Sequence, residues 1–210
     1  MLEELKAAVL EGNAQRAAQL TTQALQAGSD PGELLNQVLV PAMDTVGAEY
    51  ERGDRYVPEM LISAEAMKAA MQVLRPHLAE AGVKARGTVI LGTVEGDLHD
   101  IGKNLVGMML EGAGFEVVDL GTEVTADQFV QAVEEHEPDL MGMSALLTTT
   151  MVRMPEVMEA LQRAGRRDGL KVMIGGAPVT KEYAEQIGAD GYAPDAAAAV
   201  ELAKRLVPEG

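Results

Sequence analysis

The spacing of apolar residues changes character partway along the chain. Up to about residue 82, apolar positions recur every three or four residues, as they do on one face of an amphipathic helix. The pattern predicts four helices, whose apolar positions are Leu2, Leu5, Val9 and Leu10; Ala17, Leu20, Ala24 and Leu25; Leu34, Leu35, Val38, Leu39, Met43 and Val46; and Met60, Leu61, Ala64, Met67, Met71 and Leu74. Four helices with short connections favour a small antiparallel bundle.

Glycine and proline residues mark where these helices begin and end. The second helix should end at Gly28, and Asp30 followed by Pro31 is typical of the cap and first turn of a third helix. Pro41 lies inside that third helix and should kink it, because proline has no backbone N–H to donate. Pro58 should begin the fourth helix.

Beyond residues 83–87, short apolar runs alternate with helical patterns. We expect strands at about 88–93, 115–120, 139–145, 170–174 and 189–192, and helices at about 101–112, 125–136, 151–165, 179–187 and 195–206. Uninterrupted apolar runs are typical of a parallel sheet that is covered on both faces. Five such strand-helix units favour a flavodoxin-like (Rossmann-like) sheet with strand order 2-1-3-4-5, in which the order reverses between the first and third strands.

The change in pattern also predicts the domain organisation. We expect an all-α bundle at residues 1–82, a linker at 83–87 and an α/β domain at 88–210. The linker assignment depends on weak apolar content next to Gly82 and Gly87, since glycines of this kind punctuate secondary structure.

Charge and composition exclude several classes of function. A formal net charge of −16 argues against a nucleic-acid or anionic-membrane surface, because both are bound mainly through Lys and Arg. The absence of cysteine excludes disulfides and thiolate metal sites. No apolar run approaches the ~20 residues of a membrane helix, and the first residues do not resemble a signal peptide, so we expect a cytoplasmic protein.

Polar and glycine residues follow four of the predicted strands. Asp97 and His99 follow the first strand, 144–150 the third, Gly175-Gly176 the fourth, and Gly191-Tyr192 the fifth. The carboxyl ends of parallel strands meet at one edge of the sheet, where ligands bind in open α/β folds. These residues are therefore expected to converge on one site.

The spacing of Asp97 and His99 suits a metal-binding histidine. A carboxylate two residues away can accept one ring N–H and leave the other nitrogen free for a metal. With three histidines and no cysteine in the chain, structural zinc is disfavoured, so a single histidine would supplement a cofactor that fills the other positions. The plain alternatives are a solvated histidine, a tight turn at 175–176 and a helix cap at Ser144.

Three motifs in order carry a family resemblance. The chain has Asp-x-His-x-x-Gly at 97–102, Ser-x-Leu at 144–146 and Gly-Gly at 175–176. These motifs resemble the cobalamin-binding domain of methionine synthase and the corrinoid proteins of methyltransferase systems. The segment 53–60 also resembles the start of the cap helix in that family's four-helix domain.

The resemblance implies a cofactor and a set of contacts. The cofactor is cobalamin or a related cobamide in its methyl form, bound base-off and His-on, with His99 as the lower cobalt ligand and Asp97 hydrogen-bonded to His99. Further contacts to the cofactor and its displaced tail are implied for Asp100, Ile101, Gly102, Ser144, Leu146, Thr148, Gly175, Gly176, Gly191 and Tyr192. Tyr56, Met60 and Met67 would cover the methyl-bearing face, although both methionines suit a bundle core equally well.

The implied function is methyl transport. A substrate-specific methyltransferase would load a methyl group from a donor such as methanol, a methylamine or a methoxylated aromatic. A second methyltransferase would pass it to a thiol or a tetrahydrofolate-type acceptor, and a reductive-activation protein is a further partner. The protein would be a corrinoid subunit that is not catalytic alone.

Other classes of function remain as alternatives. Mutase-type cobalamin domains share the Asp-x-His motif but lack the helical cap. A cobalamin-sensing regulator would need an output domain. A phosphoacceptor receiver would need an aspartate near the end of the third strand and a lysine near the fifth, where this chain has Ser144 and Gly191-Tyr192.

Overall fold

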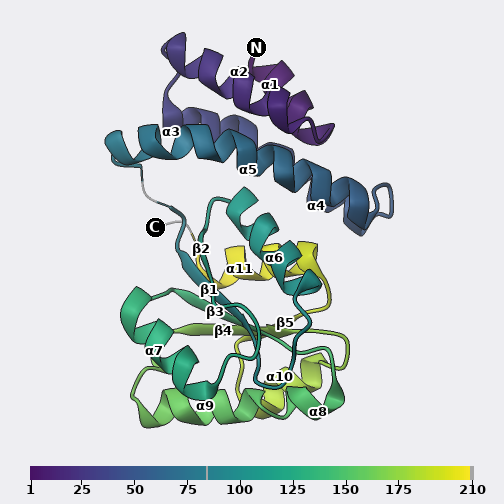
Figure 1. Ribbon diagram of the computed structural model, residues 1–210, viewed down its shortest axis with the longest axis vertical. Helices are drawn as coiled ribbons and strands as arrows, with labels where there is room; N and C mark the ends of the chain where they lie inside the picture. The colour runs from purple at the N-terminus through teal and green to yellow at the C-terminus, as the bar shows by residue number, and fades with distance from the viewer. Residues whose placement is uncertain (84, 209–210) are drawn as a thin grey trace. The chain divides into compact units, whose positions relative to one another are not determined.

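A computed structural model describes residues 1–83 and 85–208 (Figure 1). The chain forms two compact units, Met1–Ala85 with Glu111–Gly114, and Arg86–Leu110 with Phe115–Gly210. Lys84, within the predicted linker, lies outside the described residues. The domain boundaries at 82 and 88 stay a prediction.

The first unit consists of helices. Its elements are α1 (Leu2–Leu10), α2 (Ala14–Gln26), α3 (Pro31–Glu33), η1 (Leu34–Leu39), α4 (Val40–Glu51) and α5 (Val57–Glu80). The caps follow from the sequence, since the side chains of Asn13 and Asp30 accept hydrogen bonds from the backbone N–H groups of Arg16 and Glu33. The core includes Leu5, Val9, Leu20, Leu39, Met43, Val46, Met60, Met67 and Leu74.

The expected kink at Pro41 takes the form of a π-helical turn. α3, η1 and α4 run on as one helix, and within it the backbone N–H of Val40 donates to the carbonyl of Leu35, five residues back. Proline cannot donate its own hydrogen bond, and a wider turn lets the helix continue past that gap in the ladder. Proline inside a helical pattern therefore changed the helix type here without ending the helix.

The second unit is a five-stranded parallel sheet with helices on both faces. Its elements are β1 (Thr88–Thr93), α6 (Ile101–Gly112), β2 (Glu116–Asp119), α7 (Ala126–His136), β3 (Leu140–Ser144), α8 (Thr148–Met151), α9 (Met154–Arg163), β4 (Lys171–Gly175), α10 (Lys181–Ile187), β5 (Gly191–Ala193) and α11 (Ala196–Leu206). The strand order β2-β1-β3-β4-β5 confirms the flavodoxin-like prediction. α7, α9 and α10 cover one face of the sheet, and α6 and α11 cover the other (Figure 1).

The apolar runs of the strands form the core of this unit. On the face covered by α7 and α9, a cluster of buried side chains includes Ile90, Val94, Phe129, Met141, Val157, Leu161, Val172 and Ile174. Both faces of the central strands are covered, which is why their sequences read as continuous apolar runs instead of alternating with polar residues.

One predicted helix begins three residues later than expected, after a separate short helix. The sequence pattern predicted a single helix at 151–165, whereas α8 ends at Met151 and α9 begins at Met154. Pro155 lies in the first turn of α9, a position where its missing N–H costs no hydrogen bond. The apolar periodicity continues across the break, so periodicity alone did not reveal it.

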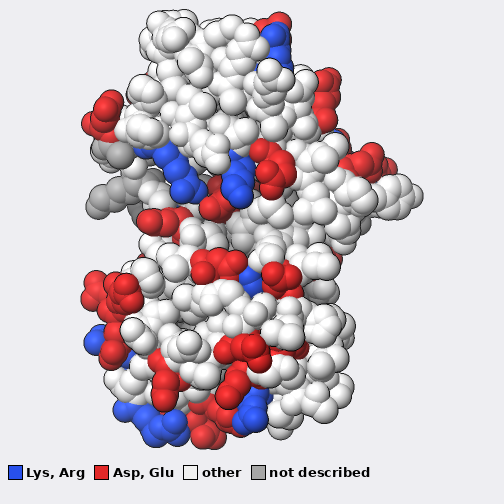
Figure 2. All heavy atoms as spheres, viewed as in Figure 1, with Lys and Arg blue, Asp and Glu red and all other residues white. Residues whose placement is uncertain are grey.

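Acidic side chains are spread over the surface of both units. On the face shown in Figure 2, Asp and Glu outnumber Lys and Arg, in keeping with 33 acidic and 17 basic residues in the chain. Within the described residues, no helix is long and apolar enough to cross a membrane.

Candidate functional site

The register of the sheet brings the predicted motifs to one edge. Thr93 at the end of β1 pairs with Ser144 at the end of β3, and Ser144 pairs with Gly175 at the end of β4. The loop that carries Asp97 and His99 therefore begins beside the loop that follows Ser144. This edge lies where the strand order reverses, as expected for a ligand site in this fold.

Asp97 is the centre of the hydrogen bonds at this edge. Its side chain is fully buried. Oδ2 accepts hydrogen bonds from the backbone N–H of Leu146 (2.8 Å) and from Oγ1 of Thr150 (2.6 Å), while Oδ1 accepts from the backbone N–H of His99 (3.0 Å) and lies 2.7 Å from His99 Nδ1. The carboxylate thus joins the loop after β1 to the loop after β3.

These hydrogen bonds determine the charge of Asp97. Burial raises the pKa of its carboxyl group, but hydrogen bonds from Thr150, Leu146 and His99 outweigh burial and hold the pKa well below its usual range. Asp97 is therefore a carboxylate at neutral pH, and a carboxylate accepts hydrogen bonds but donates none. The proton of the 2.7 Å contact consequently belongs to His99 Nδ1, which leaves Nε2 of the neutral ring with its lone pair.

The side chain of His99 is exposed to solvent, while its backbone is held by a hydrogen bond. Its side chain is 52% exposed, and its carbonyl accepts a hydrogen bond from the hydroxyl of the buried Thr93 (3.0 Å). Across the part of the chain that the structure describes, no hydrogen bond to Nε2 is found. The ring nitrogen that can bind a metal is thus accessible, and the nitrogen that orients the ring is fixed.

Exposed apolar side chains occur in the two segments that Asp97 joins. In the described part of the second unit, the large hydrophobic residues with exposed side chains are Leu98, Ile101, Leu146, Leu147 and Val152. They all belong to the segment 98–101 or the segment 146–152. An apolar patch of this kind marks a binding surface. A flat apolar ligand with a metal at its centre fits this combination of an apolar surface and an imidazole nitrogen.

The other predicted contact residues at this edge differ in whether they already form hydrogen bonds within the protein. Space is open where a side chain would extend from Gly102. Thr148 is exposed and Ser144 is half-buried, and no hydrogen bond to either hydroxyl is found among the described residues. Asp100, in contrast, accepts a hydrogen bond from the side-chain amide of Asn104 (3.0 Å).

The structure places Gly191 and Tyr192 within β5 (Gly191–Ala193), where they pair with Met173 and Ile174, so they do not follow the fifth strand as the sequence predicts. Gly176, which follows β4, and Gly191 at the start of β5 are both required by the packing of the protein itself. Gly176 has φ +125°, and a Cβ atom there would lie 1.8 Å from the carbonyl oxygen of Ala145. A Cβ at Gly191 would lie 2.7 Å from the side chain of Leu202. Close approach of neighbouring segments therefore accounts for both glycines, and their role in leaving room for a cofactor tail stays a prediction. Tyr192 packs partly buried against the core.

The three predicted residues of the helical unit differ in exposure. Tyr56 is 71% exposed and directly precedes α5. Met60 and Met67 on α5 are buried, as expected for the bundle-core alternative. Their predicted place over the methyl-bearing face stays a prediction.

Two polar residues of this site do not stand out in the sequence. Thr150 is buried, and its hydroxyl donates a hydrogen bond to Asp97, whereas the family resemblance implies a role for Thr148 in the same run of threonines. Thr93 anchors the His99 carbonyl. Each is a hydroxyl residue in a position that could have drawn notice, Thr93 at the end of an apolar strand and Thr150 shortly after Ser144-Ala145-Leu146. The sequence does not indicate which residue either hydroxyl bonds.

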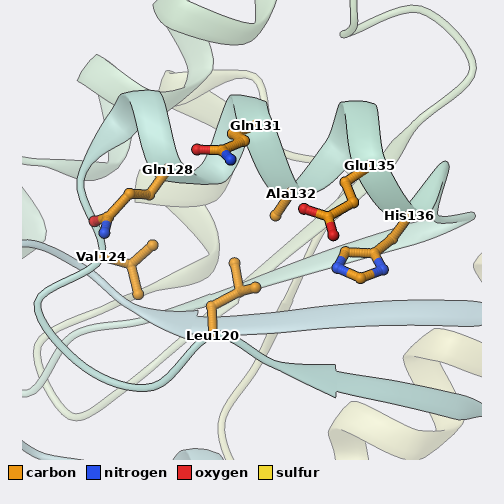
Figure 3. A pocket seen from close by; sticks show the side chains of 7 residues that line it. All are labelled: Leu120, Val124, Gln128, Gln131, Ala132, Glu135 and His136. Atoms are coloured by element: carbon orange, nitrogen blue, oxygen red, sulfur yellow. The ribbon is translucent and has the colours of Figure 1, made fainter.

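A hollow elsewhere in the second unit is a poorer candidate. It has a volume of about 190 Å³ and is lined by Leu120, Val124, Gln128, Gln131, Ala132, Glu135 and His136 (Figure 3). Ligand pockets usually measure about 300–1,000 Å³. Among the described residues, no group of three or more His, Cys, Asp or Glu side chains could hold a metal ion. The edge with His99 therefore remains the candidate site, where a cofactor would supply the remaining ligands of the metal.

Comparison with known proteins identifies the family. A B12 binding domain model matches residues 87–201, and a second B12 binding domain model matches residues 1–75. A corrinoid protein of Desulfitobacterium hafniense is 41% identical over 99% of this chain and 97% of its own length. Trimethylamine corrinoid protein 2 of Methanosarcina mazei is 42% identical over 100% of this chain and 97% of its own length.

A solved structure agrees with these matches. The methanol:cobalamin methyltransferase complex MtaBC from Methanosarcina barkeri contains a chain that superposes with a TM-score of 0.87 at 31% identity, covering 100% of this chain and 80% of that one. Identity and coverage at these levels extend over both units of the chain. The protein therefore belongs to the family of B12-binding corrinoid proteins.

Proposed function

We propose that this corrinoid protein carries a methyl group between two methyltransferases, with His99 as the protein's ligand to cobalt. The observation that carries the proposal is the His99 ring, whose Nδ1 is bonded to buried Asp97 while Nε2 is accessible among exposed apolar side chains. When bound, the corrinoid supplies the cobalt atom that accepts the methyl group and gives it up.

His99 would bind cobalt base-off and His-on, taking the place of the cofactor's own base. The Asp97 carboxylate keeps the Nδ1 proton of His99 in place, which orients the ring and increases the basicity of Nε2.

The remaining contacts divide by chemistry. Leu98, Ile101, Leu146 and Leu147 offer apolar surface to the corrin ring, and Gly102 leaves space beside it. Hydroxyls suit the polar tail of the cofactor, so we assign Ser144 and Thr148 to it. Asp100, Gly175, Gly176, Gly191 and Tyr192 complete the proposed lower contacts, and Tyr56, Met60 and Met67 the proposed upper ones.

The partners follow from the carrier role. Transfer from the methyl donor and transfer to the methyl acceptor each require a methyltransferase. A reductive-activation protein would return oxidised cobalt to the reduced state that accepts a methyl group. The relatives named for trimethylamine make a methylated amine the first donor to test. We further propose domains at 1–82 and 88–210 with a linker at 83–87, and a cytoplasmic location.

The proposal is tested by reconstitution with cobalamin. The wild-type protein should retain the red-orange colour of the cofactor through gel filtration. The cobalt(II) form is then measured by electron paramagnetic resonance in unlabelled protein and in protein labelled with ¹⁵N-histidine. The nitrogen splitting of the cobalt signal should differ between the two samples.

His99→Ala should abolish that difference, and His77→Ala, a substitution in the helical unit, should leave it intact. A splitting in the wild type that is unaffected by the histidine label would mean that the cofactor's own base stays on cobalt, and the proposed ligation would be wrong.

A further inference from the structure

A buried lysine lies close to the His99 loop and has no part in the contacts described above. Lys103, on the first turn of α6, is only 4% exposed. Lysine is almost never fully buried unless its ammonium group is paired. Its Nζ donates to Oδ1 of Asp119 (2.6 Å) and to the side-chain oxygen of Asn104 (2.6 Å). The charge is therefore compensated, and the pair joins α6 to the end of β2.

Asp119 in turn shapes the loop that follows β2. Its Oδ1 also accepts the backbone N–H of Gly121 (2.9 Å), and Gly121 has φ +81°. The Gly121 carbonyl accepts the N–H of Thr93, whose hydroxyl anchors the His99 carbonyl. A chain of hydrogen bonds thus runs from Lys103 through the β2–α7 loop to the backbone of His99.

A second connection runs through Glu123 in the same loop. The backbone N–H of Glu123 donates to the carbonyl of Asp97 (3.2 Å). Glu123 has φ +55°, a left-handed conformation that is sterically unfavourable for a residue other than glycine. This strained backbone persists where its surroundings hold it, and here it directs a donor at the residue that orients His99.

On the other side, Asn104 links Lys103 back to the His99 loop. Its side-chain oxygen accepts from Lys103 while its amide nitrogen donates to Asp100, the residue that follows His99. Lys103 thus connects to the loop both through Asn104 and through Asp119.

We infer that Lys103 and Asp119 are positioning residues for His99: their ion pair holds the β2–α7 loop against the His99 loop and so keeps the ring in the orientation that presents Nε2. The inference rests on the proposed ligation of cobalt by His99. Neither residue contacts the ring, so both would act through Asn104, Thr93 and the backbone of Asp97.

The two members of the pair differ in what their removal leaves behind. Without Asp119, a buried ammonium would keep only Asn104 as partner, which is costly. Without Lys103, the half-exposed Asp119 keeps its hydrogen bond to Gly121 and has access to water. Lys103→Met, which preserves the apolar stem, is therefore the cleaner test, and Asp119→Asn is a milder second variant.

The first readout needs no cofactor. In the apoprotein, long-range ¹H–¹⁵N correlation spectra should show His99 in the wild type as the Nδ1–H tautomer when it is neutral. Lys103→Met should give a mixture of both tautomers, and Asp119→Asn should shift the spectrum in the same direction. This readout tests the orientation of the His99 ring separately from its ligation of cobalt.

The second readout uses cobalamin in the cobalt(II) form. The ratio of histidine-bound to histidine-free cobalt, measured by electron paramagnetic resonance with ¹⁵N-histidine, should fall about tenfold in Lys103→Met, at the lower end of effects seen for groups that orient metal ligands. Asp119→Asn should give a smaller fall.

Two controls separate positioning from general destabilisation. Lys181→Met removes a lysine of α10 whose side chain is 76% exposed, and Val172→Ala weakens the buried core of β4. Val172→Ala should lower the melting temperature while the tautomer and the cobalt(II) ratio stay as in the wild type. An unchanged tautomer and ratio in both Lys103→Met and Asp119→Asn would overturn the inference. A wild type without histidine-bound cobalt would instead overturn the proposed ligation.

Discussion

The two ends of the parallel sheet hold carboxylates in different ways. At the carboxyl end, Asp97 is fully buried and its partner His99 is half exposed. At the amino end, Asp190 accepts the backbone N–H of Val172 (2.8 Å) and pairs with Arg167 (2.8 Å). Both carboxylates link neighbouring segments by accepting backbone and side-chain hydrogen bonds.

The difference lies in the partner. Arg167 also donates hydrogen bonds to the carbonyls of Leu170 and Gly188, so its guanidinium is bound by groups of the protein itself. Arginine stays charged at any ordinary pH and has no lone pair to offer. His99, by contrast, has two ring nitrogens, of which Nδ1 contacts Asp97 and Nε2 remains available to a ligand. A buried or half-buried carboxylate is therefore part of a structural ion pair at one end of the sheet, and orients a potential metal ligand at the other.

Removing the carboxylate should have the largest effect at the carboxyl end. Asp97→Ala leaves the N–H of Leu146, the hydroxyl of Thr150 and the ring of His99 without their acceptor, so we expect a loss of roughly 3 kcal/mol in the free energy of unfolding, together with the loss of stable cobalamin retention.

The matched change at the amino end is Asp190→Ala. It should also destabilise the protein, by about 1–3 kcal/mol, because it leaves Val172 and Arg167 without their acceptor. Urea unfolding and gel filtration with cobalamin measure both properties. If Asp190→Ala also released cobalamin while the protein remained folded, the functional division between the two ends would be wrong.

The low pKa of Asp97 predicts a specific dependence of stability on pH. Because the pKa is depressed in the folded state, the ionised carboxylate stabilises the protein fully above the unfolded value of about 4, and this contribution is lost as pH falls below it. Asp97→Asn has no such contribution. The difference in free energy of unfolding between wild type and Asp97→Asn should therefore shrink between pH 6 and pH 3; a constant difference would contradict the depressed pKa.

The hydroxyl of Thr150 should have a smaller effect. Thr150→Val keeps the shape of the side chain but removes the donor to Asp97, and hydrogen bonds to charged groups contribute about 1.5–3 kcal/mol. Thr150→Ser retains the donor and should recover most of the stability. In the cobalt(II) form, Thr150→Val should also change the ratio of histidine-bound to histidine-free cobalt, and an unchanged ratio would limit Thr150 to a structural role.

The smallest effect is expected from Arg167→Lys at the amino end. The charge is retained, but an ammonium cannot reach Leu170, Gly188 and Asp190 with the fork geometry of a guanidinium. We expect a loss of about 1 kcal/mol in stability by urea unfolding, with cobalamin retention as in the wild type. A change in cobalamin binding would show that the amino end influences the site.

Much of the fold could be predicted because it depends on local spacing. The parallel order of the five strands followed from alternating strand and helix patterns, and the helical unit from apolar residues every three or four positions. The helix predicted at about 151–165 is α9 (Met154–Arg163), which begins three residues later than expected and has Pro155 in its first turn.

The site was less predictable than the fold. Asp97 and His99 stood out because they are two residues apart, and their hydrogen bond is a local one. Thr150 did not, because its bond to Asp97 spans 53 residues and exists only through the register of β1 and β3.

The amino-acid sequence by itself determined the order and type of the elements and the edge where the motifs meet, since backbone geometry translates residue spacing directly into helix, strand and strand end. Only the tertiary structure decided which oxygen of Asp97 each donor reaches, why Gly176 must be glycine beneath the Ala145 carbonyl, and that buried Lys103 pairs with Asp119. These features depend on distances between loops that are far apart in the chain, and such distances are defined only when the strands have paired.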